Sequence, residues 1–147
     1  MAGFKSVGDI LDFAIARESE AHEFYVKLAD CIEDPAVREV VERFAVEELR
    51  HRVRLEAIRA GDADFVREEP GSLEIAEAMP DVQPHPNMTY AELLIVAMNR
   101  EKAAFRIYTN LASIARTLES RETLLMLARE EAQHKLRLEI EYDLATF

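Results

Sequence analysis

One internal repeat constrains the fold of this chain more than any other feature. Residues 14–31 align without a gap with residues 97–114, and residues 43–56 align with residues 126–139, both at an offset of 83 positions. Identical residues recur at matching positions, including Ala14/Ala97, Glu18/Glu101, Tyr25/Tyr108, Glu48/Glu131 and His51/His134. The repeat predicts two copies of one structural unit, arranged as a pseudo-two-fold pair.

Apolar residues recur within each copy at the spacing of an amphipathic helix. This periodicity predicts four helices, at about residues 7–31, 35–60, 90–115 and 120–143. Asp34 and Pro35 supply an N-cap and a first-turn proline, and Thr89 with Glu92 forms a capping-box pattern. Each copy is therefore expected to be a helical hairpin with a short loop.

The segment between the two hairpins, residues 61–88, holds Pro70, Pro80, Pro84 and Pro86 and is predicted to be a long crossover. One short helix is expected within it, around residues 73–79. Helices of this length span roughly 38 Å, which the crossover can bridge. The predicted fold class is all-α: a four-helix bundle of two antiparallel hairpins joined by one long crossover, in a single domain covering residues 1–147.

The charge balance limits the partners of the chain. The sequence has 29 acidic and 18 basic residues, a formal net charge of −11, which disfavours nucleic acid or an anionic membrane surface. Asp9 and Asp12 interrupt the apolar start of the chain, so no signal segment or membrane span is expected, and a soluble cytoplasmic protein is the prediction. Cys31 is the single cysteine, so a metal ion here would take oxygen and nitrogen ligands.

The predicted core stripe of each helix is apolar except at its middle. There, each helix carries a glutamate, and the second and fourth helices add a histidine one turn later. The loops lie at equal distances from the glutamates of each hairpin, so the six groups are expected to converge in one layer. They are Glu18, Glu48, His51, Glu101, Glu131 and His134.

Four carboxylates in a dry core require compensation, because burying an unpaired charge costs several kcal/mol or more. Two divalent cations would balance four carboxylates and two neutral imidazoles. The Glu-x-x-His spacing places oxygen and nitrogen ligands on adjacent turns of one helix face. This ligand set predicts a dinuclear centre of iron, with manganese or zinc as the alternatives in the purified protein.

These motifs resemble the ferritin-like di-iron carboxylate pattern over about residues 10–140. The segments ARESEAHEFY and FAVEELRH are similar to the rubrerythrin branch of that superfamily. The resemblance implies that Glu48 and Glu131 bridge the metals, that Glu18 and Glu101 are terminal ligands, and that His51 and His134 each cap one metal.

The resemblance also implies a function: reduction of hydrogen peroxide or dioxygen at a non-haem di-iron centre that a separate electron-donor protein re-reduces. Two features depart from typical rubrerythrins. The cysteine-rich rubredoxin module is missing, and Ala104 stands where an extra carboxylate is common. The remaining ligand set resembles the bacterioferritin centre equally, so a ferroxidase or iron-storage protein is the alternative. A metal-free helical adaptor is the second alternative.

Tyr25 and Tyr108 lie two turns beyond Glu18 and Glu101, where they would either act on the metal centre as hydrogen-bond donors or electron relays, or serve as core residues. His22 flanks the core stripe and is expected at the surface or at a subunit contact. Arg17 and Arg100 would either support the ligand carboxylates or, as the favoured alternative, form surface salt bridges.

Several apolar residues fall outside the predicted core stripes, which favours a homo-oligomer, expected to be a dimer. They are Phe4, Phe13, Ile15, Phe24, Leu93, Ile95 and Ile107.

Overall fold

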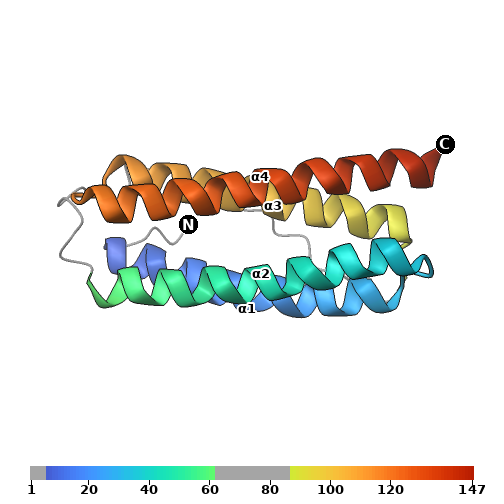
Figure 1. Ribbon diagram of the computed structural model, residues 1–147, viewed down its shortest axis with the longest axis horizontal. Helices are drawn as coiled ribbons and strands as arrows, with labels where there is room; N and C mark the ends of the chain where they lie inside the picture. The colour runs from blue at the N-terminus through green and yellow to red at the C-terminus, as the bar shows by residue number, and fades with distance from the viewer. Residues whose placement is uncertain (1–5, 62–86) are drawn as a thin grey trace. The chain divides into compact units, whose positions relative to one another are not determined.

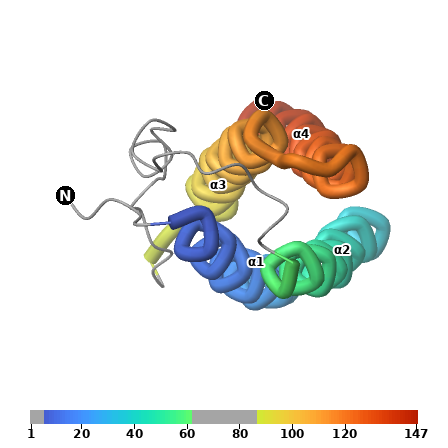
Figure 2. Tube along the Cα trace, turned by 90° about the vertical axis from the view of Figure 1, so that its left-hand side faces the viewer, coloured from blue at the N-terminus to red at the C-terminus, as the bar shows by residue number. Residues whose placement is uncertain are grey.

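The computed structural model describes residues 6–61 and 87–147, which form four long helices. These are α1 (Val7–Asp30), α2 (Pro35–Ala60), α3 (Tyr90–Ser113) and α4 (Leu118–Thr146). Their contacts divide the chain into two compact units, one holding α1 and α2 and the other α3 and α4. In each unit the two helices run side by side in opposite directions (Figure 1) and pack along their lengths (Figure 2). Each unit is thus the predicted antiparallel hairpin.

The helices begin where the capping residues predict. The Asp34 carboxylate accepts from the backbone N–H of Ala36 at 2.9 Å, ahead of Pro35 in the first turn of α2. At the start of α3, the Thr89 hydroxyl accepts from the Glu92 N–H at 3.1 Å, and the Glu92 carboxylate accepts from the Thr89 N–H at 2.8 Å. This reciprocal pair is the predicted capping box, and it satisfies two backbone donors that the helix itself leaves unbonded.

The bounds of three helices differ slightly from prediction. Helix α4 begins at Leu118 rather than near residue 120, because the Thr117 hydroxyl caps it by accepting from the Ser120 N–H at 3.1 Å. It then continues to Thr146, past the predicted end at 143. Helices α1 and α3 end one and two residues early, at Asp30 and Ser113. Helix ends shift by this much because few contacts hold the last turn.

The repeat extends into the loop of each hairpin. The Arg38 guanidinium donates from Nε and Nη2 to the carbonyl of Ile32, at 2.9 and 2.6 Å. Arg121, 83 positions later, donates from Nη2 to the carbonyl of Ala115 at 3.2 Å. Both arginines therefore bond a carbonyl just beyond the preceding helix, and the two hairpins turn in the same way.

The core of each hairpin is the predicted apolar stripe. In the first hairpin the Tyr25 ring packs edge-on against Phe24 and Phe44, with ring centroids 5.4 and 5.6 Å apart. These edge-to-face contacts fix the tyrosine ring between the two helices. In the second hairpin the fully buried large side chains are Leu94, Tyr108, Leu111, Leu124, Leu127 and Leu138.

Some predictions fall on residues outside the described ranges. They are the crossover over most of residues 61–88, its short helix at 73–79 and the apolar Phe4. None of the four described helices has a stretch apolar and long enough to cross a bilayer. The single domain over residues 1–147 stays a prediction.

Candidate metal centre

The first hairpin buries a cluster of two carboxylates and one imidazole. Glu18 comes from the middle of α1, and Glu48 and His51 come from the middle of α2, with exposed fractions of 2%, 0% and 0%. The His51 Nδ1 lies 3.3 Å from Glu18 Oε2 and 3.2 Å from Glu48 Oε1. Each of the three side chains offers one ligand atom, and these atoms lie within 4.8 Å of one another.

The second hairpin carries the same cluster at the repeat-related positions. Glu101 from α3 and Glu131 and His134 from α4 are also buried. The His134 Nδ1 lies 2.8 Å from Glu101 Oε2 and 3.3 Å from Glu131 Oε1. Their ligand atoms again lie within 4.8 Å of one another. All six residues singled out in the sequence are thus brought together in two groups of three, one in each hairpin.

Helix periodicity explains why the clusters form. Glu48 and His51 are three residues apart, as are Glu131 and His134, so each pair projects from one face of its helix. The antiparallel neighbour brings its own glutamate to the same level. Leu55 and Leu138 follow one turn after the two histidines and are fully buried, so each cluster lies beside apolar side chains.

The charge of each cluster favours a bound cation. Two carboxylates carry two negative charges, and a protonated histidine would compensate only one of them. An uncompensated charge in a dry interior costs several kcal/mol, whereas one divalent ion would balance both carboxylates and leave the imidazole neutral as a ligand. The two glutamates and one histidine of each cluster offer oxygen and nitrogen donors, a set that suits iron or manganese. Each cluster therefore fits iron, the metal predicted from the sequence.

The two candidate tyrosines are buried core residues, with exposed fractions of 1% for Tyr25 and 2% for Tyr108. Each lies on the same helix as a cluster glutamate, two turns later. Each tyrosine therefore belongs to the core stripe of its own hairpin, and its role at the centre stays a prediction.

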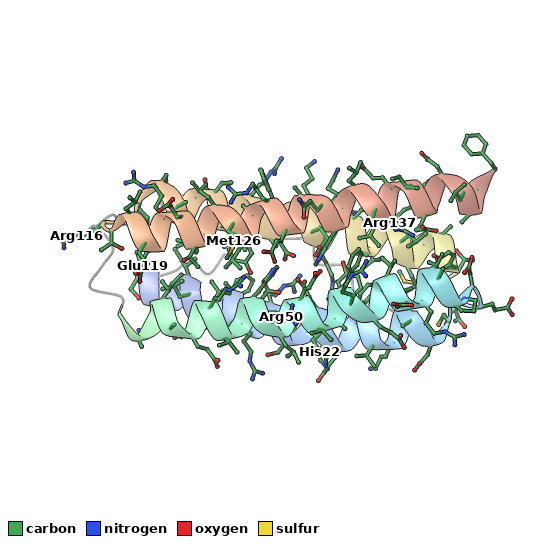
Figure 3. All side chains as sticks on the ribbon, in the orientation of Figure 1. His22, Arg50, Arg116, Glu119, Met126 and Arg137 are labelled. Atoms are coloured by element: carbon green, nitrogen blue, oxygen red, sulfur yellow. The ribbon has the colours of Figure 1, made fainter. Side chains whose placement is uncertain are left out.

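Two flanking residues lie deeper than expected. His22 is half-buried, and its Nδ1–H donates to the backbone carbonyl of Ala45 at 2.8 Å, so it ties α1 to α2 instead of serving only the surface (Figure 3). Arg100 is buried, at 9% exposed, where a surface salt bridge was expected. Arg17 does lie near the surface, 3.6 Å from Glu20.

The fold is all-α with four long helices, as the sequence predicts. A solved structure titled "Hypothetical Protein Pfu-1136390-001 From Pyrococcus furiosus" superposes with a TM-score of 0.75. It is 24% identical, and the match covers 95% of this chain and 89% of that one. Among curated proteins, none matches the sequence.

The family is shown by the sequence itself. The model of the rubrerythrin family matches residues 9–81 and 92–143, which include both clusters and most of the chain. The protein therefore belongs to the rubrerythrin family, and its paired carboxylate–histidine clusters indicate a binuclear metal site.

Proposed function

We propose that the protein is a rubrerythrin-like redox protein that reduces hydrogen peroxide or dioxygen at a pair of iron ions held by the six clustered residues. The observation that carries this proposal is the buried Glu, Glu, His cluster that occurs once in each hairpin of a rubrerythrin-family chain. Each hairpin brings the charge and the donors for one ion, so two hairpins account for two ions.

The six clustered residues would have different roles as metal ligands. Glu48 and Glu131 would bridge the two ions, Glu18 and Glu101 would bind one ion each, and His51 and His134 would each supply a nitrogen ligand. When bound, such a metal pair supplies a Lewis-acidic site and electrons for the reduction of peroxide. In each cluster the histidine Nδ1 lies close to carboxylate oxygens of the two glutamates. These same atoms would bind the metal.

The surrounding residues would control water and protons. Buried leucines beside the clusters limit the access of water, which strengthens every electrostatic interaction inside. Tyr25 and Tyr108 would donate hydrogen bonds to ligand carboxylates or relay electrons. The electrons would come from a separate electron-donor protein.

A stopped-flow experiment tests the proposal. The iron-loaded, reduced protein is mixed with hydrogen peroxide, and its optical spectrum is followed. We expect rapid oxidation in the parent and in Glu47→Gln, and at least about 100-fold slower oxidation in Glu48→Gln, because loss of a metal ligand costs at least that much in metal binding or activity. Glu47 is half-buried and next to Glu48 in the chain, so it is a matched control. Equal rates in Glu48→Gln and the parent would refute the proposal.

A ferroxidase or iron-storage role is the second candidate. Ala104 leaves the ligand set symmetric between the hairpins, and the acidic composition suits attraction of free ferrous ions. This function needs a large closed assembly. Two results would favour this function over the first proposal. Size-exclusion chromatography would give a cage-sized particle, and the protein would rapidly oxidise added ferrous ion while its reduced metal pair is not oxidised by peroxide.

We also propose that the protein is a homodimer. The apolar surface is smaller than expected, because Phe24 and Ile107 are buried. Exposed apolar residues nevertheless recur along α4, at Leu125, Leu136 and Ile140. Light scattering that gives the mass of one chain in dilute solution would contradict the dimer.

A further inference from the structure

A groove lies along the second hairpin, between α3 and α4, outside the metal cluster. It has a volume of about 360 Å³, at the lower end of the range for sites that bind small molecules. Its walls come from two helices of one compact unit. The lining residues are Lys102, Phe105, Arg106, Ala132, Lys135 and Glu139.

The groove is basic although the chain carries a net charge of −11. Three of its six lining residues are cationic and one is acidic. Lys135 Nζ donates to the Glu139 carboxylate at 2.8 Å, so that pair is mutually compensated. Lys102 and Arg106 are exposed and form no ion pair with any residue in the described ranges. Two positive charges therefore remain available to an anion at this groove.

The groove also has an apolar, aromatic wall. Phe105 is 39% exposed, and Ala132 beside it leaves room because its side chain is a single methyl group. A flat apolar ring could pack on Phe105 while an acidic group reaches Lys102 or Arg106.

The first hairpin provides an internal comparison. Its residue at the position of Ala132 is the larger Leu49, and its residue at the position of Phe105 is His22. There the side chains bond to each other or to the backbone: His22 to the Ala45 carbonyl, and Arg52 Nη1 to the Ser19 hydroxyl at 3.3 Å. The position of Ser19 is Lys102 in the second hairpin. The two copies share a fold and differ at this place, so the fold does not require the basic groove.

We propose that this groove binds a small organic anion with a flat apolar ring, whose ring packs against Phe105 and Ala132 and whose carboxylate, phosphate or sulfonate group pairs with Lys102 and Arg106. The apolar wall disfavours a bare inorganic anion. The groove is also lined by six residues, far fewer than the roughly 20–30 residues per side of a stable protein interface. This proposal goes beyond the proposed redox function and does not depend on it.

An anion bound in the groove would lie close to the metal cluster of the second hairpin. Lys102 directly follows Glu101, Ala132 follows Glu131, and Lys135 follows His134. A bound anion would therefore lie against the turns of α3 and α4 that carry the three candidate ligands. The residues that line the groove are not candidate metal ligands. The anion is therefore expected to bind with and without metal.

Titration calorimetry with 2-naphthoate tests the proposal, using the full-length protein in metal-loaded and metal-free forms. We expect saturable 1:1 binding in both forms with a dissociation constant below about 1 mM. Ala132→Leu introduces the side chain of the first hairpin and should weaken binding about tenfold or more. Lys102→Ser removes one cation and should weaken it several-fold. Arg116→Ser, which removes an exposed cation from the loop before α4, should leave binding unchanged (Figure 3).

Three results would overturn the proposal. One is the absence of saturable binding. Another is equal binding of 2-naphthalenemethanol, which lacks the charge, or of acetate, which lacks the ring. The last is an affinity in Ala132→Leu equal to that of the parent, provided that circular dichroism shows the variant folded. Ala132 is exposed and leucine is a good helix former, so the variant is expected to fold. Failure of peroxide reduction would leave these outcomes unaffected.

Discussion

Glu48 is the residue at which the physical conflict in this chain is sharpest. Its side chain is fully buried in the first hairpin, with His51 Nδ1 3.2 Å from one oxygen and a second carboxylate, Glu18, in the same cluster. Such an arrangement is unfavourable without a cation, because two carboxylates share one imidazole. Removal of the Glu48 charge should therefore have opposite effects on stability with and without metal.

We predict that Glu48→Gln melts at a higher temperature than the parent in chelator and at a lower one with metal. Glutamine keeps the shape and removes a buried charge, which should stabilise the metal-free protein by roughly 1–3 kcal/mol. With metal, the variant lacks one metal ligand, so bound metal stabilises it less than it stabilises the parent. Differential scanning calorimetry of the parent, Glu48→Gln and Glu47→Gln in both conditions checks this. A Glu48→Gln that is less stable in both conditions would contradict it.

The helices are the level at which the sequence was most informative. The apolar period placed Glu18, Glu48 and His51 on inward faces, and the cap residues Asp34 and Thr89 marked where helices begin, since these signals are local. What the sequence could not reveal depends on contacts between helices. The bond of His22 to the Ala45 carbonyl, like the burial of Arg100, follows from how two helices pack, and neither residue type predicts it.

The loop arginines lead to a prediction at this scale. Arg38→Ala should cost about 1 kcal/mol in the free energy of unfolding, because the Ile32 carbonyl loses two hydrogen bonds from a charged donor. Arg121→Ala should cost less, because the equivalent carbonyl of Ala115 receives a single bond at 3.2 Å. Urea denaturation in chelator measures both values without a contribution from metal. A larger cost for Arg121→Ala than for Arg38→Ala would contradict the prediction.

For the molecule as a whole, the repeat predicted two hairpins, each of which contributes three of the six candidate ligands to one dinuclear centre. The clusters formed because the same spacing occurs twice. The basic groove at Lys102 and Ala132 escaped prediction for the opposite reason: it lies where the two copies differ, and a difference between copies carries no periodic signal.

Metal removal should affect the stability of the whole chain. A ligand that binds only the folded state at about 1,000 times its dissociation constant stabilises it by roughly 4 kcal/mol. For a chain of this size, we expect chelation to lower the melting temperature by roughly 10 °C. The double variant His51→Ala/His134→Ala should show no such shift. An equal melting temperature for the parent with and without chelator would favour the metal-free adaptor.

Cations should lie among the six buried side chains, and anomalous diffraction detects such ions directly. Crystals of the protein from iron-replete cells would be measured on both sides of the iron absorption edge. We expect two anomalous peaks in each chain, ligated by Glu18, Glu48, His51, Glu101, Glu131 and His134. A well-ordered map without such peaks, in which these carboxylates contact only protein or water, would contradict it.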